Sequence, residues 1–216
     1  AGPTPVKTKL SSVNFTLPHS KHPPIFTRKI AMSFSQLIPS VLLILVCTNA
    51  LAGVPTIDAP LPPLAITERG ELALTDDEFS LIPWSSEAVL GKVHVIQYFG
   101  ASIEHKVPFK PFTDLLQCSF EPGAINVTTV LNLDAAMWGT TGFVMSELKK
   151  NKRMLPLAVM VVDDNGSGVI EWGLGKAGTG LIVLDDKGIV KYFSRQALSE
   201  AEMASTVELM RVNIKR

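Results

Sequence analysis

The sequence predicts an α/β fold in which helices cover both faces of a mixed central sheet. Residues 93–99 are expected to form a buried strand, because their β-branched and aromatic side chains fall on both parities and so face both sides of a sheet. Segments with strand and helix patterns alternate after it. Two late apolar runs, residues 181–184 and 189–193, flank an Asp-x-x-Gly turn, which predicts a β-hairpin.

The first 52 residues differ in composition from the rest of the chain. Residues 1–57 carry five basic side chains and no acidic one. Arg28 and Lys29 precede an apolar run, residues 37–47, and small residues end at Ala52, which is the layout of a secretory signal cleaved after Ala52. We therefore expect three parts: residues 1–31, an upstream translated segment or disordered leader; residues 32–52, the signal peptide; and residues 53–216, one globular domain.

Alternatives to a cleaved signal remain open at this point. The apolar run is shorter than the roughly 20 residues that a membrane-spanning helix needs, so a retained anchor is the second choice. A lipoprotein is less well supported, because Val46 precedes Cys47 in place of a small residue. An acid-free leader is also compatible with an organellar transit peptide.

The composition of the domain excludes one class of partner. All 20 acidic residues but only 15 of the 20 basic residues lie beyond residue 57, which gives the domain a net charge of −5. Nucleic-acid binding needs a clustered excess of base, so we expect no nucleic-acid partner. If Cys47 leaves with the signal, Cys118 has no intrachain partner, and we expect its thiol to be buried in the last turn of a helix.

Turn and capping residues divide the first half of the domain. Residues 64–74 are expected to form a hairpin with Gly70 in its turn, because glycine tolerates positive φ. Asp76 and Asp77 are expected to cap a short helical turn. Pro108 and Pro111 mark the start of a helix over residues 112–118.

The second half continues the alternation. Strands are predicted over residues 125–133 and 155–162, on either side of an amphipathic helix over residues 142–152. The basic residues that end this helix complement its dipole in preference to forming an anion site; they are Lys149, Lys150, Lys152 and Arg153. The last helix begins at Ser199 with a capping box and turns Met203, Val207 and Met210 inward.

The order of these elements, with the segments LGKVHVIQYFGAS and LIVLDDKGIVKYF, resembles the thioredoxin-like superfamily. Residues 54–216 resemble more closely the YtfJ family of bacterial periplasmic proteins, through ITERGEL, LGKV, TTGFVMSELKKNK, VDDNG and LIVLDDKG in that order. The resemblance implies a thioredoxin-like three-layer fold and export to the periplasm. It does not imply a particular activity.

The residues that carry thioredoxin chemistry are missing from this resemblance. Alignment with a redox thioredoxin loop places the two cysteines of the C-x-x-C motif near Ile103 and Lys106, and the cis-proline near Thr179. Thiol–disulfide exchange needs an attacking thiolate and is helped by a second, resolving thiol. This loop supplies neither.

The other polar residues of the loop are Ser102, Glu104 and His105, beside Lys106. Residues this close in sequence rarely align a nucleophile, a base and an orienting group, and no G-x-S-x-G elbow is present. Glu104 and His105 supply too few ligands for a metal site, since His94 is expected to be a core residue. We therefore expect a solvated loop, with no metal and no cofactor.

Acidic and glycine-rich turns later in the chain are interpreted as structural. The turns at residues 163–166 and 185–188 lack the further oxygen ligands and the closing Glu of a calcium loop. The glycines of residues 175–180 are not followed by a helix that would complete a phosphate site.

We expect a non-catalytic binding or accessory protein of the periplasm, with no stable membrane span once the signal is removed. Its partner would be an envelope protein or a small ligand. The expected binding face comprises residues 102–106, the loop 134–140 with Trp138, and residues 178–180 with Thr179. Trp138 is expected either to be an exposed anchor for the partner or to fold as a lid over the sheet edge.

A second hypothesis belongs to a different class. Cys118 could serve a single-cysteine thiol oxidoreductase or a peroxide sensor, working with a partner thiol. This function needs an exposed, reactive thiol. A position late in a helix works against it, because the negative end of the helix dipole does not stabilise a thiolate.

Overall fold

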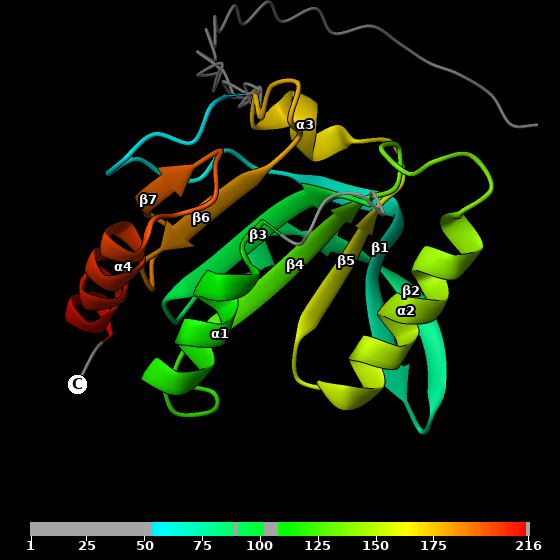
Figure 1. Ribbon diagram of the computed structural model, residues 1–216, viewed down its shortest axis with the longest axis horizontal. Helices are drawn as coiled ribbons and strands as arrows, with labels where there is room; N and C mark the ends of the chain where they lie inside the picture. Colours follow the sequence, from blue (N-terminus) through cyan, green and yellow to red (C-terminus); the bar gives the residue numbers. More distant parts are fainter. Residues whose placement is uncertain (1–52, 89, 102–107, 215–216) are drawn as a thin grey trace, which may run out of the picture. The chain divides into compact units, whose positions relative to one another are not determined.

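The protein is described, in a computed structural model, over residues 53–88, 90–101 and 108–214, which belong to one compact unit (Figure 1). The strands are β1 (Ala65–Thr75), β2 (Glu78–Ser85), β3 (His94–Gly100), β4 (Asn126–Asn132), β5 (Val159–Asp163), β6 (Gly180–Leu184) and β7 (Val190–Ser194). The helices are α1 (Lys110–Ser119), α2 (Thr141–Met154), α3 (Ser167–Glu171) and α4 (Glu200–Asn213), with a 3-10 turn at Ser86–Ala88.

The predicted mixed sheet is confirmed, and β3 lies inside it as expected. The strand order is β2-β1-β5-β4-β3-β6-β7. β3 pairs in parallel with β4 and antiparallel with β6, and β4 pairs in parallel with β5. The first five residues of β3 are all buried, because elements of the fold cover both faces of this strand.

Helices lie on both sides of the sheet. α1 and α4 pack on one face against Val95, Leu181 and Val183, and α2 packs on the same face against Leu131 and Met160. Figure 1 looks onto this face, with α1 and α2 in front of the strands. The opposite face is covered by the α3 segment and the arm before β1, which add Trp172, Leu174 and Leu64 to the core around Ile96, Tyr98 and Val161.

The first predicted hairpin is wrong in its turn. β1 runs without interruption through Gly70, which has φ +72° and lies at an irregularity in the β1–β2 register between Ile66 and Glu71. The turn is instead formed by Asp76 and Asp77, with φ +49° and +65°, the two positive angles of a type I′ turn. The prediction that these two residues cap a helical turn is wrong. Asp can form such a turn because its short polar side chain tolerates the left-handed region of φ and ψ.

Two further predictions are corrected between β4 and β6. Residues 155–158 form a turn after α2 in place of the start of a strand, since Pro156 cannot donate to a ladder and the Ala158 amide bonds the Leu155 carbonyl at 3.0 Å. Helix α3 was not predicted. It has five residues, too few to show a hydrophobic period.

The carboxyl-terminal elements are confirmed. β6 and β7 form the predicted hairpin, and the Asp185 carboxylate accepts the amides of Lys187 at 2.9 Å and Ile189 at 3.0 Å across its turn. The capping box at Ser199 and Glu202 starts α4. Val207 and Met210 are buried, and Met203 packs beside them.

Candidate functional site

Two described parts of the predicted binding face, Thr179 and the loop with Trp138, lie at the edge of the sheet where β3 ends. β3 and β4 are parallel and end together, with Gly100 opposite Asn132. Residue 101 and the loop 133–140 therefore both follow strands that end at this edge. β6 runs the other way, with Gly180 opposite Tyr98, so Thr179 lies at the same edge. The topology thus places the loop 133–140 and Thr179 at the same edge, although they are far apart in sequence.

Four predicted binding residues fall outside the part of the chain that the structure describes. They are Ser102, Glu104, His105 and Lys106. Their chemical identities still bear on function, because the sequence contains no cysteine from residue 53 to residue 117. Whatever the conformation of this loop, it brings no thiol to the edge.

Trp138 and Thr179 are described, and they differ in exposure. Trp138 is 97% exposed in the loop before α2, so it does not fold as a lid over the sheet. Its neighbour Met137 is 63% exposed. The Thr179 hydroxyl donates to the Arg195 carbonyl at 2.6 Å and is thus already engaged within the protein.

The expectation that Cys118 is buried is wrong. Its thiol is exposed in the last turn of α1. The inward positions of this amphipathic helix are filled by Phe112 and Leu116, so the position two residues after Leu116 points outward. Cys118 lies eight residues after Lys110, which is about 12 Å along the helix axis from the end of α1 that follows β3.

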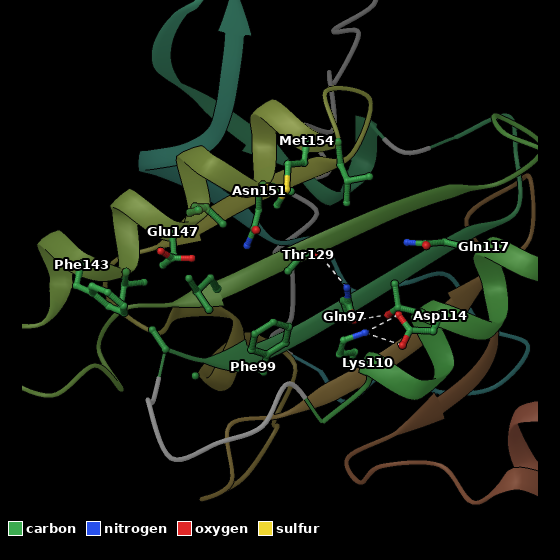
Figure 2. A pocket seen from close by; sticks show the side chains of 18 residues that line it. Gln97, Phe99, Lys110, Asp114, Gln117, Thr129, Phe143, Glu147, Asn151 and Met154 are labelled. Atoms are coloured by element: carbon green, nitrogen blue, oxygen red, sulfur yellow. Dashed lines mark hydrogen bonds and ion pairs between the residues drawn. The ribbon is translucent and has the colours of Figure 1, made fainter.

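A groove lies between α1 and α2 (Figure 2). It consists of two adjoining cavities of about 710 and 420 Å³. Its floor is formed by β3, β4 and β5, and one end opens where β3 ends, at Phe99, Gly100 and Ala101. The groove therefore begins at the edge of the sheet where β3 ends.

The groove is apolar at both ends and polar in the middle. Phe99, Leu131 and Phe143 line the first end. The second end is lined by Phe120, Ile125, Val127, Pro156 and Leu157. Phe143 and Leu157 are 62% and 89% exposed, so apolar surface faces solvent at both ends.

The polar middle is built around Gln97 of β3, which is 5% exposed and lines both cavities. Its amide nitrogen donates to the Thr129 hydroxyl at 2.6 Å. The Thr113 hydroxyl lies 3.1 Å from its amide oxygen and 3.0 Å from the Phe109 carbonyl, and donates its one proton to one of these at a time. A primary amide has two N–H groups and two acceptor lone pairs, so the bonds from described residues leave one N–H group and at least one lone pair of Gln97.

The charges around the groove are mainly negative. Lys110 is its one cationic lining residue among those described, and it is paired with Asp114 at 2.6 Å. Glu147 and Glu121 add two carboxylates. Lys150 lies 3.8 Å from Glu147, a distance at which an exposed pair neutralises little.

The basic residues at the end of α2 contact other parts of the protein. Lys152 is 5% exposed and donates to the Ala158 carbonyl at 2.7 Å. Arg153 pairs with Asp77 at 3.1 Å and lies over the Phe79 ring, as does Lys149. These cations hold α2 to the β1–β2 hairpin and to the turn after the helix, which agrees with the structural interpretation of this cluster.

His94 is a core residue, as predicted. It is 1% exposed, and its Nε2 lies 2.8 Å from the Thr128 hydroxyl, while Nδ1 has no partner among the described residues. Burial lowers the pKa of His94 to about 4, because desolvation penalises the charged imidazolium. The ring is therefore neutral near pH 7.

Asp163, at the end of β5, forms hydrogen bonds with other residues of the protein core. Its carboxylate accepts the Tyr98 hydroxyl at 2.7 Å and the amides of Ser167 and Gly168 at 3.0 and 2.9 Å. Burial and the bond to Asp163 raise the pKa of the Tyr98 hydroxyl, which stays protonated and donates. No group of three metal-ligating side chains occurs among the described residues.

The order of the strands and the placement of the helices define a thioredoxin-like α/β protein. The fold is similar to that of Mycobacterium tuberculosis AhpC, with a TM-score of 0.50 and 16% identity over 74% of this chain and 93% of that chain. It is also similar to the thioredoxin-like superfamily protein SPOA0173, with a TM-score of 0.50 and 14% identity over 70% of this chain and 96% of that one. At these identities the likeness concerns the fold alone.

Sequence comparison identifies the family. Residues 56–213 match the profile described as "Bacterial protein of unknown function (YtfJ_HI0045)". The Escherichia coli K12 protein "Uncharacterized protein YtfJ" is 32% identical over 71% of this chain and 84% of its own length. A Haemophilus influenzae protein is 30% identical over the same shares. The chain belongs to the YtfJ_HI0045 family, which confirms the resemblance noted in the sequence.

The groove was not predicted, although the sequence contains one signal for it. Gln97 is a polar amide in the middle of a strand whose neighbours Val95, Ile96, Tyr98 and Phe99 are all apolar. A buried polar group needs hydrogen-bond partners, so its presence there indicates a polar point in the covering layer. The space beside it depends on how far apart α1 and α2 lie, which no local pattern specifies.

Proposed function

We propose that this protein is an exported, non-catalytic binding protein of the periplasm, and that it binds an extended peptide segment in the groove between α1 and α2. The observation that carries the proposal is the alternation of an apolar end, a polar middle and a second apolar end in this groove. An extended peptide has the same alternation, with side chains flanking a backbone amide.

The size and the hydrogen-bonding groups of the groove support this ligand class. Ligand sites in proteins usually occupy about 300–1,000 Å³ and combine apolar walls with a few polar groups. The spare N–H and the spare lone pair of Gln97 match the carbonyl and the N–H of one peptide group. Apolar side chains on either side of that group would contact Phe99 and Leu131 at one end and Ile125 and Leu157 at the other.

The charges of the groove favour a neutral or basic segment. Three carboxylates and one paired lysine line the two cavities in the described part of the chain. An acidic ligand would lie near like charges in a partly desolvated site, which is unfavourable.

The residues predicted from sequence are proposed to contact the part of the partner that emerges from the groove. They are Ser102, Glu104, His105, Lys106, Trp138 and Thr179. Trp138 supports this role best, because a fully exposed tryptophan has a large apolar surface to bury on binding.

Export is proposed from the signal-like residues 32–52. Among the residues that the structure describes, no helix has the length and apolar character required to cross a bilayer. Amino-terminal sequencing of the protein from cell fractions tests the assignment: a chain in the periplasmic fraction that begins at Gly53 supports it, and an uncleaved chain in the cytoplasm contradicts it.

Selection from a library of displayed random octapeptides tests the groove. We expect enriched peptides to have two apolar side chains separated by a short spacer and to lack acidic residues. Phe143→Asp should weaken binding of these peptides at least tenfold, since it places a carboxylate on an apolar wall.

Ile170→Asp is the matched control, because Ile170 is 72% exposed on α3 at the opposite face of the sheet. Its binding should equal that of the wild type. The proposal is contradicted if no peptide class is enriched, or if both variants lose binding equally.

One observation favours the second candidate function, the single-cysteine oxidoreductase. The thiol of Cys118 is exposed, which that function requires. Its position at the negative end of α1 does not favour a thiolate, and the groove residues do not include it.

A further inference from the structure

The two outer edges of the sheet differ in how they are protected. At the β7 edge, the arm before β1 adds backbone hydrogen bonds: the Asp58 amide donates to the Val190 carbonyl at 2.8 Å, and the Val190 amide donates to the Ala59 carbonyl at 2.9 Å. Pro60 forms a bridge with Ile189. The protein therefore covers the start of this edge, at Ile189 and Val190, with its own chain.

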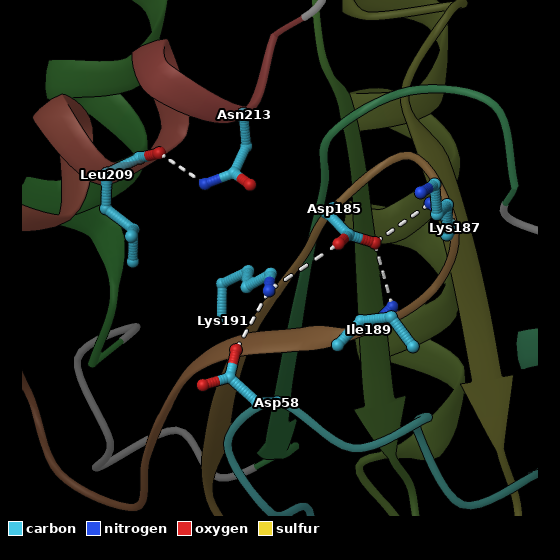
Figure 3. Close-up of polar contacts among 7 residues, drawn as sticks. All are labelled: Asp58, Asp185, Lys187, Ile189, Lys191, Leu209 and Asn213. Atoms are coloured by element: carbon cyan, nitrogen blue, oxygen red, sulfur yellow. Dashed lines mark hydrogen bonds and ion pairs between the residues drawn. The ribbon is translucent and has the colours of Figure 1, made fainter.

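A side-chain contact fixes the arm on β7 (Figure 3). The Lys191 ammonium lies 2.8 Å from the Asp58 carboxylate and 3.7 Å from that of Asp185. The hydrogen bond to Asp58 contributes most to the raised pKa of Lys191. The start of this edge is thus held by backbone and side-chain bonds together.

The β2 edge has no such cover among the described residues. β2 pairs only with β1, and its other side faces outward. Leu81 and Ile82 are 40% and 44% exposed, and because neighbouring strand residues point to opposite faces, apolar surface is exposed on both faces of this edge. The strand carries one charged residue, Glu78, and no lysine or arginine that would discourage pairing.

The hairpin register identifies the unpaired backbone groups of β2. The two-residue turn at Asp76 and Asp77 makes Thr75 and Glu78 a hydrogen-bonded pair, and such pairs alternate along the ladder. Ser80 and Ile82 therefore direct their N–H and C=O groups to β1. Phe79 and Leu81 direct theirs to the free edge. Pro83 follows with a carbonyl but no N–H, which ends the row of donors.

We propose that β2 pairs antiparallel with β2 of a second copy of this chain, about a two-fold axis at Ser80. In this register Phe79 of each copy lies opposite Leu81 of the other, and the two pairs exchange four N–H···O=C bonds. The free N–H groups of Phe79 and Leu81 are all satisfied. Pro83, which has no N–H group, lies outside the paired segment and does not have to donate a hydrogen bond. The two seven-stranded sheets become one continuous sheet.

The side chains in this register are compatible on both faces. The two Ser80 residues form the closely spaced non-hydrogen-bonded pair, where Cα atoms approach to about 4.5 Å and a small side chain fits. Phe79 lies beside Leu81 of the second copy, an aromatic–aliphatic pair. Glu78 lies opposite Ile82 of the second copy, so the two Glu78 carboxylates do not face each other.

A second copy fits this edge better than an unrelated peptide. The pattern of free groups is symmetric about Ser80, and a two-fold interface requires a surface that complements itself. The interaction also buries Leu81 and Ile82 of both copies at once. The dimer does not depend on the proposed peptide groove, which is lined by other residues.

Sedimentation velocity of the protein purified from its producing cells tests the dimer over a range of concentrations. The wild type should sediment as a reversible dimer. Ser80→Lys should weaken self-association at least tenfold, because two ammonium groups would face each other at the axis. Ser80→Thr is the matched control and should remain dimeric, since paired threonines are favourable at such a site.

Cross-linking provides a positive test that does not depend on loss of function. In a Cys118→Ser background, Ser80→Cys should give a disulfide-linked dimer under mild oxidation. Val212→Cys, at a position 84% exposed on α4, should not do so at the same concentration. A monomeric wild type overturns the proposal, as does a dimer that survives Ser80→Lys or a cross-link that forms no faster than the Val212→Cys control.

Discussion

Asp163→Ala is expected to lower the free energy of unfolding by about 3–5 kcal/mol, although Asp163 lies outside the proposed groove. The carboxylate is 1% exposed and accepts three hydrogen bonds. Its removal leaves the Tyr98 hydroxyl and two amides at the start of α3 without an acceptor. Each buried polar group left unpaired costs about 1–3 kcal/mol.

Urea denaturation of Asp163→Ala and Asp164→Ala measures this effect against a neighbouring control. The Asp164 carboxylate pairs with Arg69 at 2.7 Å, but both side chains are about one-third exposed. A partly exposed ion pair contributes at most about 1 kcal/mol, so this variant should remain close to the wild type. Equal losses in the two variants would contradict the role assigned to the Asp163 network.

Acid is expected to destabilise the protein through His94 by about 3 kcal/mol between pH 7 and pH 4. The pKa of His94 in the folded protein is lowered to about 4 from its ordinary 6.5. Between these values the unfolded chain binds a proton that the folded protein does not, so stability falls as the pH falls through this range. Above about pH 7 both states are neutral and His94 contributes no pH dependence.

Unfolding free energies of the wild type and His94→Gln, measured from pH 7.5 to pH 4, isolate this contribution from that of the carboxylates. Glutamine keeps a polar group near Thr128 but has no proton to gain. The variant should lose about 3 kcal/mol less than the wild type over the range. Parallel pH profiles for the two proteins would show that His94 does not titrate as its burial implies.

Much of the fold could be predicted because its signals are local. The β-branched content of β3 and β4 predicts buried strands, and the Asp185 turn predicts the β6–β7 hairpin. The Ser199 capping box predicts the start of α4. In each of these segments, local propensity agrees with the tertiary environment, which is typical of natural sequences.

The errors occurred where two local signals competed. Gly70 and the pair Asp76 and Asp77 all tolerate positive φ, and the pattern alone did not decide which of them turns the chain. Pairing with β2 and β5 keeps β1 extended through Gly70. The prediction for Cys118 failed because burial was inferred from residue type. The positions of Phe112 and Leu116 along α1 decide which side of the helix is buried, and Cys118 lies on the other side.

The candidate site was only partly accessible from the sequence. The absence of cysteine near residues 103 and 106 is a sequence property, and Trp138 could be singled out from its place in a loop, but only the structure showed that it is exposed and not a lid. The groove required the structure, because Gln97, Thr113 and Thr129 come from three elements that meet only in the folded sheet. The pattern of β3 indicates a polar point at Gln97, but the distance between α1 and α2 that opens the groove is not specified within any one segment.

These observations support a consistent account of function. The chain retains a thioredoxin-like frame, and the loop at the end of β3 brings no thiol to the edge where such proteins place their redox pair. An apolar groove with a polar centre begins at the same edge. In the proposed function this frame positions a binding surface, and the Asp163 hydrogen bonds stabilise the frame.

The claim that this thioredoxin-like protein does not catalyse thiol–disulfide exchange is tested most directly by the rate at which dithiothreitol reduces insulin disulfides in its presence. We predict that the wild type and Cys118→Ser both leave the rate at its uncatalysed value. Acceleration by the wild type that disappears in Cys118→Ser would contradict the account and establish Cys118 as a redox residue.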